Sequence, residues 1–272
     1  MDKIQNKIQN LTAQIKKQDS VVIGLSGGVD STLLTRVAFD ALGDKVLAVI
    51  GASATLPVTE MAEAEQLAQE IGVNYRIIKT EETDDLKFKS NPVDRCYFCK
   101  SELFSKLQEI AKNENYTCVF DGTNLDDMGD YRPGLRANEE HNVFSPLKEA
   151  GFTKNDIREA AKFLGLPNWD KPAMPCLSSR FPYGQPIELA SLSQVERAER
   201  FLRELGFRES RVRHYDETAK IEVPIEDLSI IVSLENRERI TTKFREIGYV
   251  YVTLDLAGFA SGSMNKVIDT AN

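Results

Sequence analysis

The stretch from Val21 to Thr32 constrains the fold of this chain more than any other part of the sequence. It begins with Val21-Val22-Ile23-Gly24, a short apolar run typical of a buried parallel strand. A turn with the adjacent glycines Gly27 and Gly28 follows and leads into a helix. Glycines let the backbone turn tightly and approach a ligand closely. Because the start of a helix presents unpaired N–H groups and a positive dipole end, the stretch predicts a phosphate-binding loop.

The type of phosphate-binding loop is narrowed by what the sequence lacks. A Walker-type loop needs Gly-Lys followed by Ser or Thr, and no Gly-Lys pair occurs in the chain. The dinucleotide pattern G-x-G-x-x-G is also missing, because the two glycines are adjacent. The pattern that remains, Ser-Gly-Gly-Val-Asp-Ser-Thr, resembles the loop of the ATP pyrophosphatase (PP-loop) superfamily. That resemblance implies cleavage of ATP between the α- and β-phosphates and adenylation of a substrate oxygen; the alternative is a glycine turn without a ligand.

Strands and helices alternate through the first half of the chain. Apolar runs and helical periodicity predict them, in order, at 21–24, 31–42, 45–50, 59–71, 74–78, 96–112 and 116–121. This order predicts an α/β fold with a doubly wound parallel sheet. Ligands of such sheets bind beyond the carboxyl ends of the strands. The PP-loop resemblance therefore implies that ATP and Mg²⁺ bind at that edge, through Ser26, Gly27, Gly28, Asp30, Ser31, Thr32, Ser53, Gly122 and Asp127.

The segment 167–186 contains five prolines, which exclude a regular helix or a central strand. We expect it to join a PP-loop ATP-binding domain, residues 1–170, to a smaller α+β domain, residues 171–272, for substrate binding and oligomerisation. The second domain is predicted to hold helices near 190–205, 225–233 and 236–247 and strands near 210–215, 218–223 and 249–254. In the first domain, the acidic segment 79–95 and the polar segment 122–134 are expected to be loops.

The composition is ordinary for a soluble globular protein, with 42% hydrophobic and 28% charged residues. A net charge of −8 disfavours a broad nucleic-acid interface. No apolar run is long enough to cross a membrane, and the polar amphipathic helix expected at 1–17 does not resemble a secretion signal. Four cysteines do not form a disulfide framework in a chain of this length, so a reducing, cytoplasmic setting is expected.

The second chemical signal is Cys96-Tyr97-Phe98-Cys99 at a predicted helix start, with Cys176 later in the proline-rich segment. A C-x-x-C pair fits a redox site, half of a zinc site or part of an iron–sulfur site. A structural zinc needs four ligands, three cysteines with an open position suit a [4Fe–4S] cluster, and thiols at a helix start are activated for redox chemistry. Cys118 lies in an apolar run, where a buried inert thiol is expected. On spacing alone the three alternatives stay open.

The third signal is the run from Cys176 to Gly184, which places a thiol, two hydroxyls and a guanidinium on one proline-locked loop. Together with the PP-loop and Asp130-Tyr131-Arg132-Pro133-Gly134, it resembles the LarE family of ATP-dependent sulfur transferases, which make the nickel-pincer cofactor of lactate racemase. The likeness runs through essentially the whole chain and includes Arg211-Val212-Arg213 and the closing run from Tyr251 to Leu256. Several motifs in the same order make it more specific than the PP-loop alone.

The resemblance implies a reaction. Enzymes of this family adenylate the carboxylates of a pyridinium biscarboxylic acid mononucleotide, and sulfur then displaces AMP to leave thiocarboxylates. In one branch the sulfur comes from a cysteine at the position of Cys176, which becomes dehydroalanine, and the C-x-x-C is absent. Since this chain has Cys96 and Cys99, it resembles the three-cysteine branch. There the cysteines hold a [4Fe–4S] cluster, and a sulfide on the unique iron is transferred.

The resemblance also implies roles for individual side chains. Charge that develops on the phosphates would be stabilised by Lys100, Arg180 and Mg²⁺, with Asp30 as the nearby carboxylate. Adding the sulfur-bearing Cys176 completes the predicted catalytic set.

The resemblance further implies how the acceptor is bound. Arg211 and Arg213 alternate on one strand face, as bidentate binding of its phosphate would need, with Ser179 nearby. Glu199 and Glu222 match family acids that gather a cation near subunit contacts. The expected partners are thus a small mononucleotide substrate, further copies of the chain and a transient sulfide donor, with no nucleic acid and no membrane.

Rival interpretations come from other classes of protein. A tRNA-thiolating PP-loop enzyme has the same cluster logic but needs an RNA-binding region, against which the net charge and the lack of basic–aromatic interleaving argue. The non-enzymatic alternative is an adenine-nucleotide-binding protein with a structural zinc. Bound metal separates these cases, because a cluster absorbs visible light and zinc does not.

Overall fold

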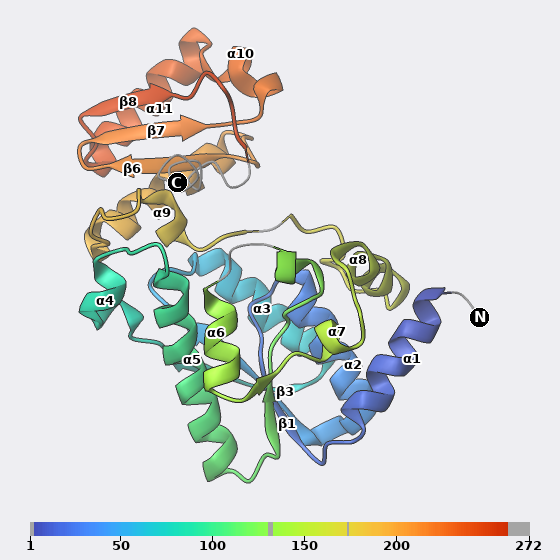
Figure 1. Ribbon diagram of the computed structural model, residues 1–272. Coiled ribbons are helices and arrows are strands. Elements are labelled where there is room, and N and C mark those ends of the chain that lie inside the picture. The colour runs from blue at the N-terminus through green and yellow to red at the C-terminus, as the bar shows by residue number, and fades with distance from the viewer. Residues whose placement is uncertain (1–2, 130–132, 173, 261–272) are drawn as a thin grey trace. The chain divides into compact units, whose positions relative to one another are not determined.

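The computed structural model describes residues 3–129, 133–172 and 174–260. They divide into two compact units, which are coloured along the chain in Figure 1. Unit 1 consists of Met1–Glu82 and Asp94–Met174, and unit 2 of Thr83–Val93 and Pro175–Asn272. The predicted domain boundary after residue 170 lies close to the boundary between Met174 and Pro175. The prediction did not assign the short segment Thr83–Val93 to the second unit.

Unit 1 is built on a five-stranded sheet in the order β3-β2-β1-β4-β5, and all of its pairings are parallel. The strands are β1 (Val21–Gly24), β2 (Val46–Ala52), β3 (Asn74–Lys79), β4 (Cys118–Phe120) and β5 (Val143–Phe144). In the central strand, Val22 stands opposite Leu47 on one side and Val119 on the other. Because the chain winds outward from β1 in both directions, the predicted doubly wound α/β fold is confirmed.

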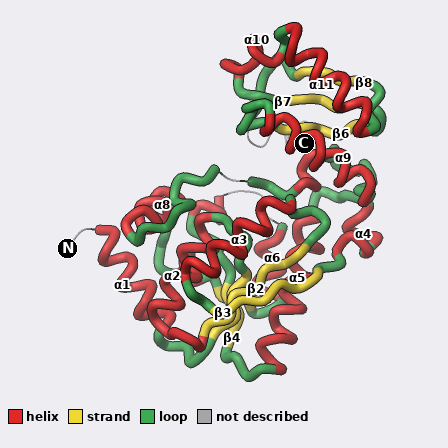
Figure 2. Tube along the Cα trace, turned by 180° about the vertical axis from the view of Figure 1, so that it is seen from behind, coloured by secondary structure: helices red, strands yellow, loops and turns green. Residues whose placement is uncertain are grey.

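Helices cover both faces of this sheet, giving three layers (Figure 1). The helices are α1 (Lys3–Ile15), α2 (Val29–Leu42), α3 (Val58–Ile71), α5 (Arg95–Asn113), α6 (Gly134–Glu140), α7 (Pro146–Glu149) and α8 (Lys154–Phe163). Figure 2 shows α5 and α6 on the side of the sheet opposite to α1, α2 and α8. The larger apolar core joins α1, α2 and α8 to the sheet, and the smaller one joins it to α5 and α6. Both faces are buried, which explains the continuous apolar runs of β1 and β2.

Unit 2 is the smaller α+β unit that the sequence predicts. Its sheet has the order β6-β7-β8, antiparallel between the first two strands and parallel between the last two. The elements are α4 (Leu86–Lys89), α9 (Leu189–Glu204), β6 (Arg211–Tyr215), β7 (Thr218–Glu222), α10 (Leu228–Ile231), α11 (Leu234–Ile247) and β8 (Tyr251–Leu254). Helices α9 and α11 pack on the sheet through a core that includes Leu202, Val212 and Phe244.

Three local predictions need correction. The expected loop 79–95 contains η2 (Glu82–Asp84) and α4, and Asn91 donates to the carbonyl oxygen of Pro182, which ties the segment to unit 2. The expected helix 225–233 is the 3₁₀ helix η5 (Ile225–Asp227) continued directly by α10, so it ends two residues earlier than predicted. The polar segment 122–134 is followed by α6, β5 and α7, which the sequence analysis did not predict. These elements are too short for a periodic signal, because β5 has only two residues.

The motif Asp130-Tyr131-Arg132 lies outside the described residues. Among those that are described, no helix is both long and apolar enough to span a lipid bilayer.

Candidate functional site

The PP-loop joins the end of β1 to the start of α2. Gly27 has φ +76°, a left-handed conformation that favours glycine, and a Cβ there would lie 3.1 Å from the Cβ of Ala64 on α3. Gly28 is the N-cap of α2, and as a glycine it provides no side-chain hydrogen bond to cap the helix. The first N–H groups of a helix have no partner within it. The geometry of the loop is thus compatible with main-chain donation to an anion, and its binding of phosphate stays a prediction.

Hydroxyl groups hold this loop in shape. The Ser31 hydroxyl lies 3.1 Å from the Ser26 hydroxyl and donates to the carbonyl oxygen of Gly28 at 3.1 Å. Thr32 donates to the same carbonyl oxygen at 2.8 Å. Ser26 is exposed, whereas Ser31 and Thr32 are buried. Of the three predicted hydroxyl ligands within the loop, Ser26 is thus the one that faces solvent, and Ser31 and Thr32 shape the loop.

The turn after β4 lies directly against the start of α2. A Cβ on Gly122 would lie 3.0 Å from the main-chain nitrogen of Ser31, so only glycine allows this approach. Asn124 donates to the Asp30 carboxylate at 3.2 Å, and its main-chain N–H donates to Asp127 at 3.0 Å. The structure therefore brings Asp30, Gly122 and Asp127 to one edge of the sheet. Carboxylate oxygens are suitable ligands for Mg²⁺, and these two acids are the ones that would hold it.

Lys100 reaches the same edge from α5. Its ammonium lies 3.2 Å from the Asp121 carboxylate. That carboxylate also accepts hydrogen bonds from Thr123 at 2.5 Å and from Ser145 at 2.6 Å. Burial raises the pKa of Asp121, but the positive charge of Lys100 and these hydrogen bonds outweigh it and lower the pKa overall. Asp121 thus remains a charged anchor for Lys100 at the carboxyl ends of the strands.

Ser53 follows β2 at this edge, where the sequence analysis expected it. Its hydroxyl contacts the Thr55 hydroxyl at 2.7 Å and donates to the Glu82 carboxylate. Glu82 is only 2% exposed. Neither Glu82 nor Asp121 was among the predicted site residues. A carboxylate in an acidic, non-periodic segment gives no sequence signal of burial, and for Asp121 the only hint was its place at the end of an apolar run.

In unit 2 the predicted loop residue Arg180 is fully buried on η4 (Leu177–Arg180). Its guanidinium makes two hydrogen bonds with Glu199 of α9, at 2.8 and 2.9 Å. It also donates to the carbonyl oxygens of Pro175 and Cys176, at 2.6 and 3.0 Å. Arg180 therefore fixes the main chain that carries Cys176. Its predicted contact with ATP phosphates stays a prediction.

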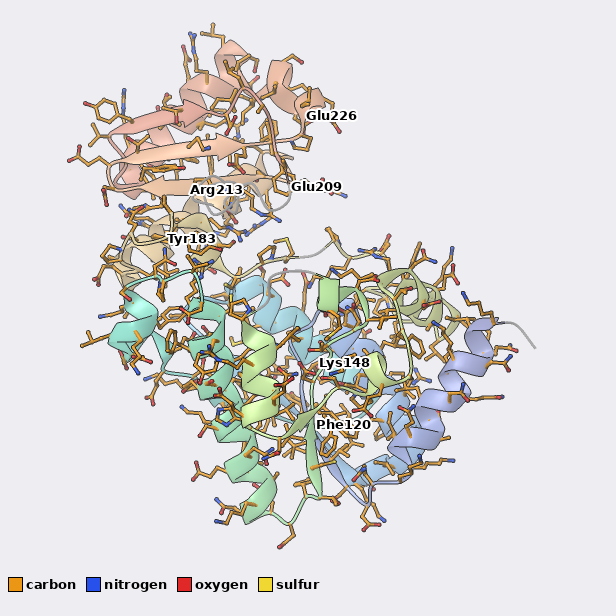
Figure 3. All side chains as sticks on the ribbon, in the orientation of Figure 1. Phe120, Lys148, Tyr183, Glu209, Arg213 and Glu226 are labelled. Carbon is orange, nitrogen blue, oxygen red and sulfur yellow. The ribbon has the colours of Figure 1, made fainter. Side chains whose placement is uncertain are left out.

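The predicted acceptor arginines lie on β6, where Arg213 is labelled in Figure 3. Arg213 donates to Glu222 at 2.6 Å and to the main-chain oxygen of Ser179 at 3.0 Å. Arg211 stacks over the ring of Phe259, with 5.0 Å between guanidinium carbon and ring centre. Burial and the positive charges of Arg180 and Arg213 lower the pKa of Arg211. The structure thus brings Ser179, Arg180, Arg211 and Arg213 together within unit 2.

Two of these arginines are paired with the glutamates that the sequence analysis singled out. Glu199 and Glu222 are each 1% exposed. Glu199 binds Arg180 and accepts from the main-chain N–H of Val212 at 3.0 Å, and Glu222 binds Arg213. Opposite charges neutralise the two carboxylates inside the unit, so their predicted cation-binding role stays a prediction.

Comparisons with known proteins agree with this geometry. Residues 1–103 match a family model described as NAD synthase. The pyridinium-3,5-bisthiocarboxylic acid mononucleotide synthase of Lactiplantibacillus plantarum is 40% identical over all of this chain and 98% of its own length. This chain belongs to the LarE family. An uncharacterized protein of Synechocystis is 43% identical over 97% of this chain and 99% of its own length. The glutamine-hydrolyzing GMP synthase of Chlamydia caviae is 25% identical over 70% of this chain and 39% of its own length.

Membership of the LarE family confirms the predicted PP-loop assignment, and it directs attention to the cysteines. Cys96 is exposed and Cys99 half-buried, both in the first turns of α5 in unit 1, whereas half-buried Cys176 precedes η4 in unit 2. Among the described residues, no three His, Cys, Asp or Glu side chains are gathered as a metal site. Cys118 is buried on β4, and burial raises its pKa to about 12, so it is an inert thiol as predicted.

Proposed function

We propose that this chain is an ATP-dependent sulfur transferase that adenylates the carboxylates of pyridinium biscarboxylic acid mononucleotide and converts them to thiocarboxylates. The observation that carries the proposal is the full-length likeness to the Lactiplantibacillus plantarum synthase. The PP-loop supports the ATP half of the reaction, because its N–H groups suit a phosphate. The buried arginines of unit 2 support the acceptor half, because the mononucleotide carries its own phosphate.

Adenylation solves a chemical problem, since a carboxylate is a poor electrophile. A carboxylate oxygen of the acceptor attacks the α-phosphorus of ATP, and pyrophosphate leaves with the electrons of the broken P–O bond. Sulfur then attacks the carboxyl carbon, and AMP leaves with the electrons of the C–O bond. One ATP is consumed for each carboxyl group. Mg²⁺ held by Asp30 and Asp127 would neutralise charge on the phosphates, and Lys100 would donate hydrogen bonds to them.

The Asp121 carboxylate positions the Lys100 ammonium for its proposed contact with the phosphates. Lys100 is the residue after Cys99 on α5, so the helix that carries the two cysteines also carries the cation. Its salt bridge with Asp121 directs the ammonium to the edge of the sheet where the PP-loop lies. The ammonium of Lys100 is thus positioned by a buried carboxylate rather than by the flexible stem of the side chain.

For the acceptor, Arg211 and Arg213 would bind the phosphate with Ser179 beside them. Their guanidinium groups are already held, Arg213 by Glu222 and Arg211 over Phe259, so little side-chain entropy is lost on binding. Two planar donors held in place suit an oxyanion with several acceptor oxygens. Copies of the chain and a transient sulfide donor complete the proposed set of partners.

For the sulfur, Cys96, Cys99 and Cys176 would hold a [4Fe–4S] cluster with an open iron, which would supply the sulfide. Three features support this proposal. The i, i+3 spacing puts Cys96 and Cys99 on one face of α5. None of the three cysteines is buried, and Arg180 fixes the Cys176 carbonyl. The cluster would need thiolates of both units to converge. The second candidate is sacrifice of Cys176 itself, which its place in the Arg180-fixed loop also allows.

Anaerobic purification followed by turnover tests the proposal. Wild-type protein with ATP, Mg²⁺, sulfide and acceptor should convert the acceptor over repeated turnovers. Mass spectrometry should detect oxygen replaced by sulfur in the acceptor. Each of Cys96→Ser, Cys99→Ser and Cys176→Ser should lower both iron content and product. Cys118→Ser, at a buried thiol away from this chemistry, should keep the iron. Dehydroalanine at position 176 in an active, iron-free protein would overturn the cluster. No thiolated acceptor under any of these conditions would overturn the proposed function.

A further inference from the structure

A lysine outside the PP-loop motif, Lys171, contacts the loop. Lys171 follows α8, and its ammonium lies 2.8 Å from a carboxylate oxygen of Glu60 and 2.7 Å from one of Glu63, both on α3. It also lies 3.4 Å from the carbonyl oxygen of Gly27. Only 14% of its side chain is exposed. Lys171 thus holds a fixed positive charge beside the turn that is expected to bind phosphate.

The residue Asn168 fixes the same segment to the loop. Its amide nitrogen donates to the Gly27 carbonyl oxygen at 3.2 Å and to the Thr32 hydroxyl at 3.0 Å. Its amide oxygen is buried and, among the described residues, accepts no hydrogen bond. An unsatisfied buried acceptor is costly, which is typical of a site that a ligand or a water completes. Asn168 and Lys171 together place the segment on both ends of the loop.

The charge of Lys171 is well defined. Burial lowers its pKa, but the hydrogen bonds and negative charges of Glu60 and Glu63 outweigh burial and hold the pKa above its usual value. The side chain therefore stays protonated at neutral pH. Without the lysine, two carboxylates of α3 would face the loop and repel the phosphates of a nucleotide.

The loop itself carries no cation. Its motif, Ser26 to Thr32, supplies N–H groups, hydroxyls and the carboxylate of Asp30, but no lysine or arginine. Pyrophosphate carries several negative charges, and binding it in a partly buried site calls for a cation as well as dipoles. Lys171 is a half-buried cation that contacts this loop directly.

We propose that Lys171 is a phosphate-binding residue of the ATP site and supplies, from a distant part of the sequence, the cation that the PP-loop motif lacks. Glu60 and Glu63 are its positioning residues. The inference rests on the proposed function, because it assumes that the loop binds the pyrophosphate portion of ATP.

Calorimetric titration of the full chain with ATP, pyrophosphate and AMP tests this inference. Lys171→Met should weaken binding of ATP and pyrophosphate at least about tenfold, the loss of one charge-assisted hydrogen bond, and should change AMP binding far less. Lys171→Arg should recover much of the affinity, because the charge is kept. The loss in Lys171→Met should shrink as salt is raised, since salt screens charge.

A matched control is available in the same unit. Lys7 is also held by a carboxylate and a glycine carbonyl, 2.6 Å from Asp156 and 2.6 Å from the Gly151 oxygen, with 21% of its side chain exposed. Lys7→Met should lower stability without weakening ATP binding. If wild-type and Lys171→Met proteins bind ATP equally, or if ATP, pyrophosphate and AMP all weaken alike, Lys171 is only structural. If the wild type binds no ATP, the proposed function itself fails.

Discussion

The PP-loop of unit 1 and the anion-binding candidates of unit 2 are built differently. The PP-loop motif itself offers main-chain N–H groups and hydroxyls, and its predicted side-chain ligand Ser26 is exposed. In unit 2 the anion-binding candidates are arginines that are nearly fully buried and already paired with carboxylates, as Arg180 is with Glu199. A main-chain site is specified by local backbone geometry. A buried guanidinium site depends on partners elsewhere in the fold, so it should be the more fragile of the two.

The largest effect is expected from Glu199→Ala. The change leaves the guanidinium of Arg180 buried without its main counter-charge, which should lower the free energy of unfolding by about 3–5 kcal/mol. Urea denaturation followed by circular dichroism measures it. Glu204→Ala is the matched control, because Glu204 is on the same helix and pairs with Arg200 at 3.8 Å but is 63% exposed. It should cost less than about 1 kcal/mol. Similar losses for both variants would contradict the comparison.

The next effect concerns the acceptor. Arg211→Ala and Arg213→Ala should each weaken binding of the acceptor mononucleotide by about 1.5–3 kcal/mol through loss of a charge-assisted bond. ATP affinity should change little, because the PP-loop belongs to the other unit. Calorimetric titration with each ligand measures both affinities. Exposed Arg208, just before β6, provides the control variant Arg208→Ala. Equal losses for ATP and acceptor would show that the arginines serve the fold alone.

A smaller effect on stability, but a selective one on function, is expected from Gly27→Ala. A Cβ in the left-handed region costs about 1–2 kcal/mol, and here it would also press on Ala64. Gly151→Ala shares the positive φ, +70°, but has no atom within 4 Å of the added Cβ. Both variants should lose stability, and only Gly27→Ala should lose ATP affinity. Normal ATP binding by Gly27→Ala would mean that the loop is not the phosphate site.

The smallest effect is a pH dependence in unit 1. Because the pKa of folded Asp121 is lowered, its charged form stabilises the fold above the unfolded value of about 3.9. That contribution is lost as the pH falls through the lower folded-state pKa. Urea titrations between neutral and acidic pH should therefore show a shallower loss of stability in Asp121→Asn than in wild type. Identical pH profiles would mean that Lys100 does not stabilise the charged carboxylate.

The same contrast explains what the sequence could predict. The PP-loop and the sheet order follow from local patterns, because apolar runs, paired glycines and helical periodicity are each read within a few residues. The ion-pair partners of the arginines are not local, because Glu199 lies on α9 and Glu222 on β7. No local sequence pattern around Arg180 or Arg213 indicates that these glutamates pair with them. Lys171 was missed for the same reason, since its contacts to Glu60 and Gly27 join distant segments.

The shortest helices and strands were also not predicted from the sequence. The helix α4 and the strand β5 have four and two residues, too few for periodicity to indicate them. The segment Thr83–Val93 joins unit 2 through contacts such as that between Asn91 and Pro182, which only tertiary structure provides. The convergence of Cys96, Cys99 and Cys176 stays a prediction that rests on the family resemblance, because the C-x-x-C spacing alone fits redox, zinc and cluster chemistry alike.

The central claim is that the PP-loop directs attack on the α-phosphorus of ATP. Phosphorus nuclear magnetic resonance of a reaction with wild-type protein, ATP, Mg²⁺ and pyridinium biscarboxylic acid mononucleotide tests it most directly. The account predicts AMP and pyrophosphate as products, formed only when the acceptor is present and together with its adenylated or thiolated form. Release of ADP and orthophosphate would contradict the account, because the γ-phosphate rather than the α-phosphate would then be the site of attack.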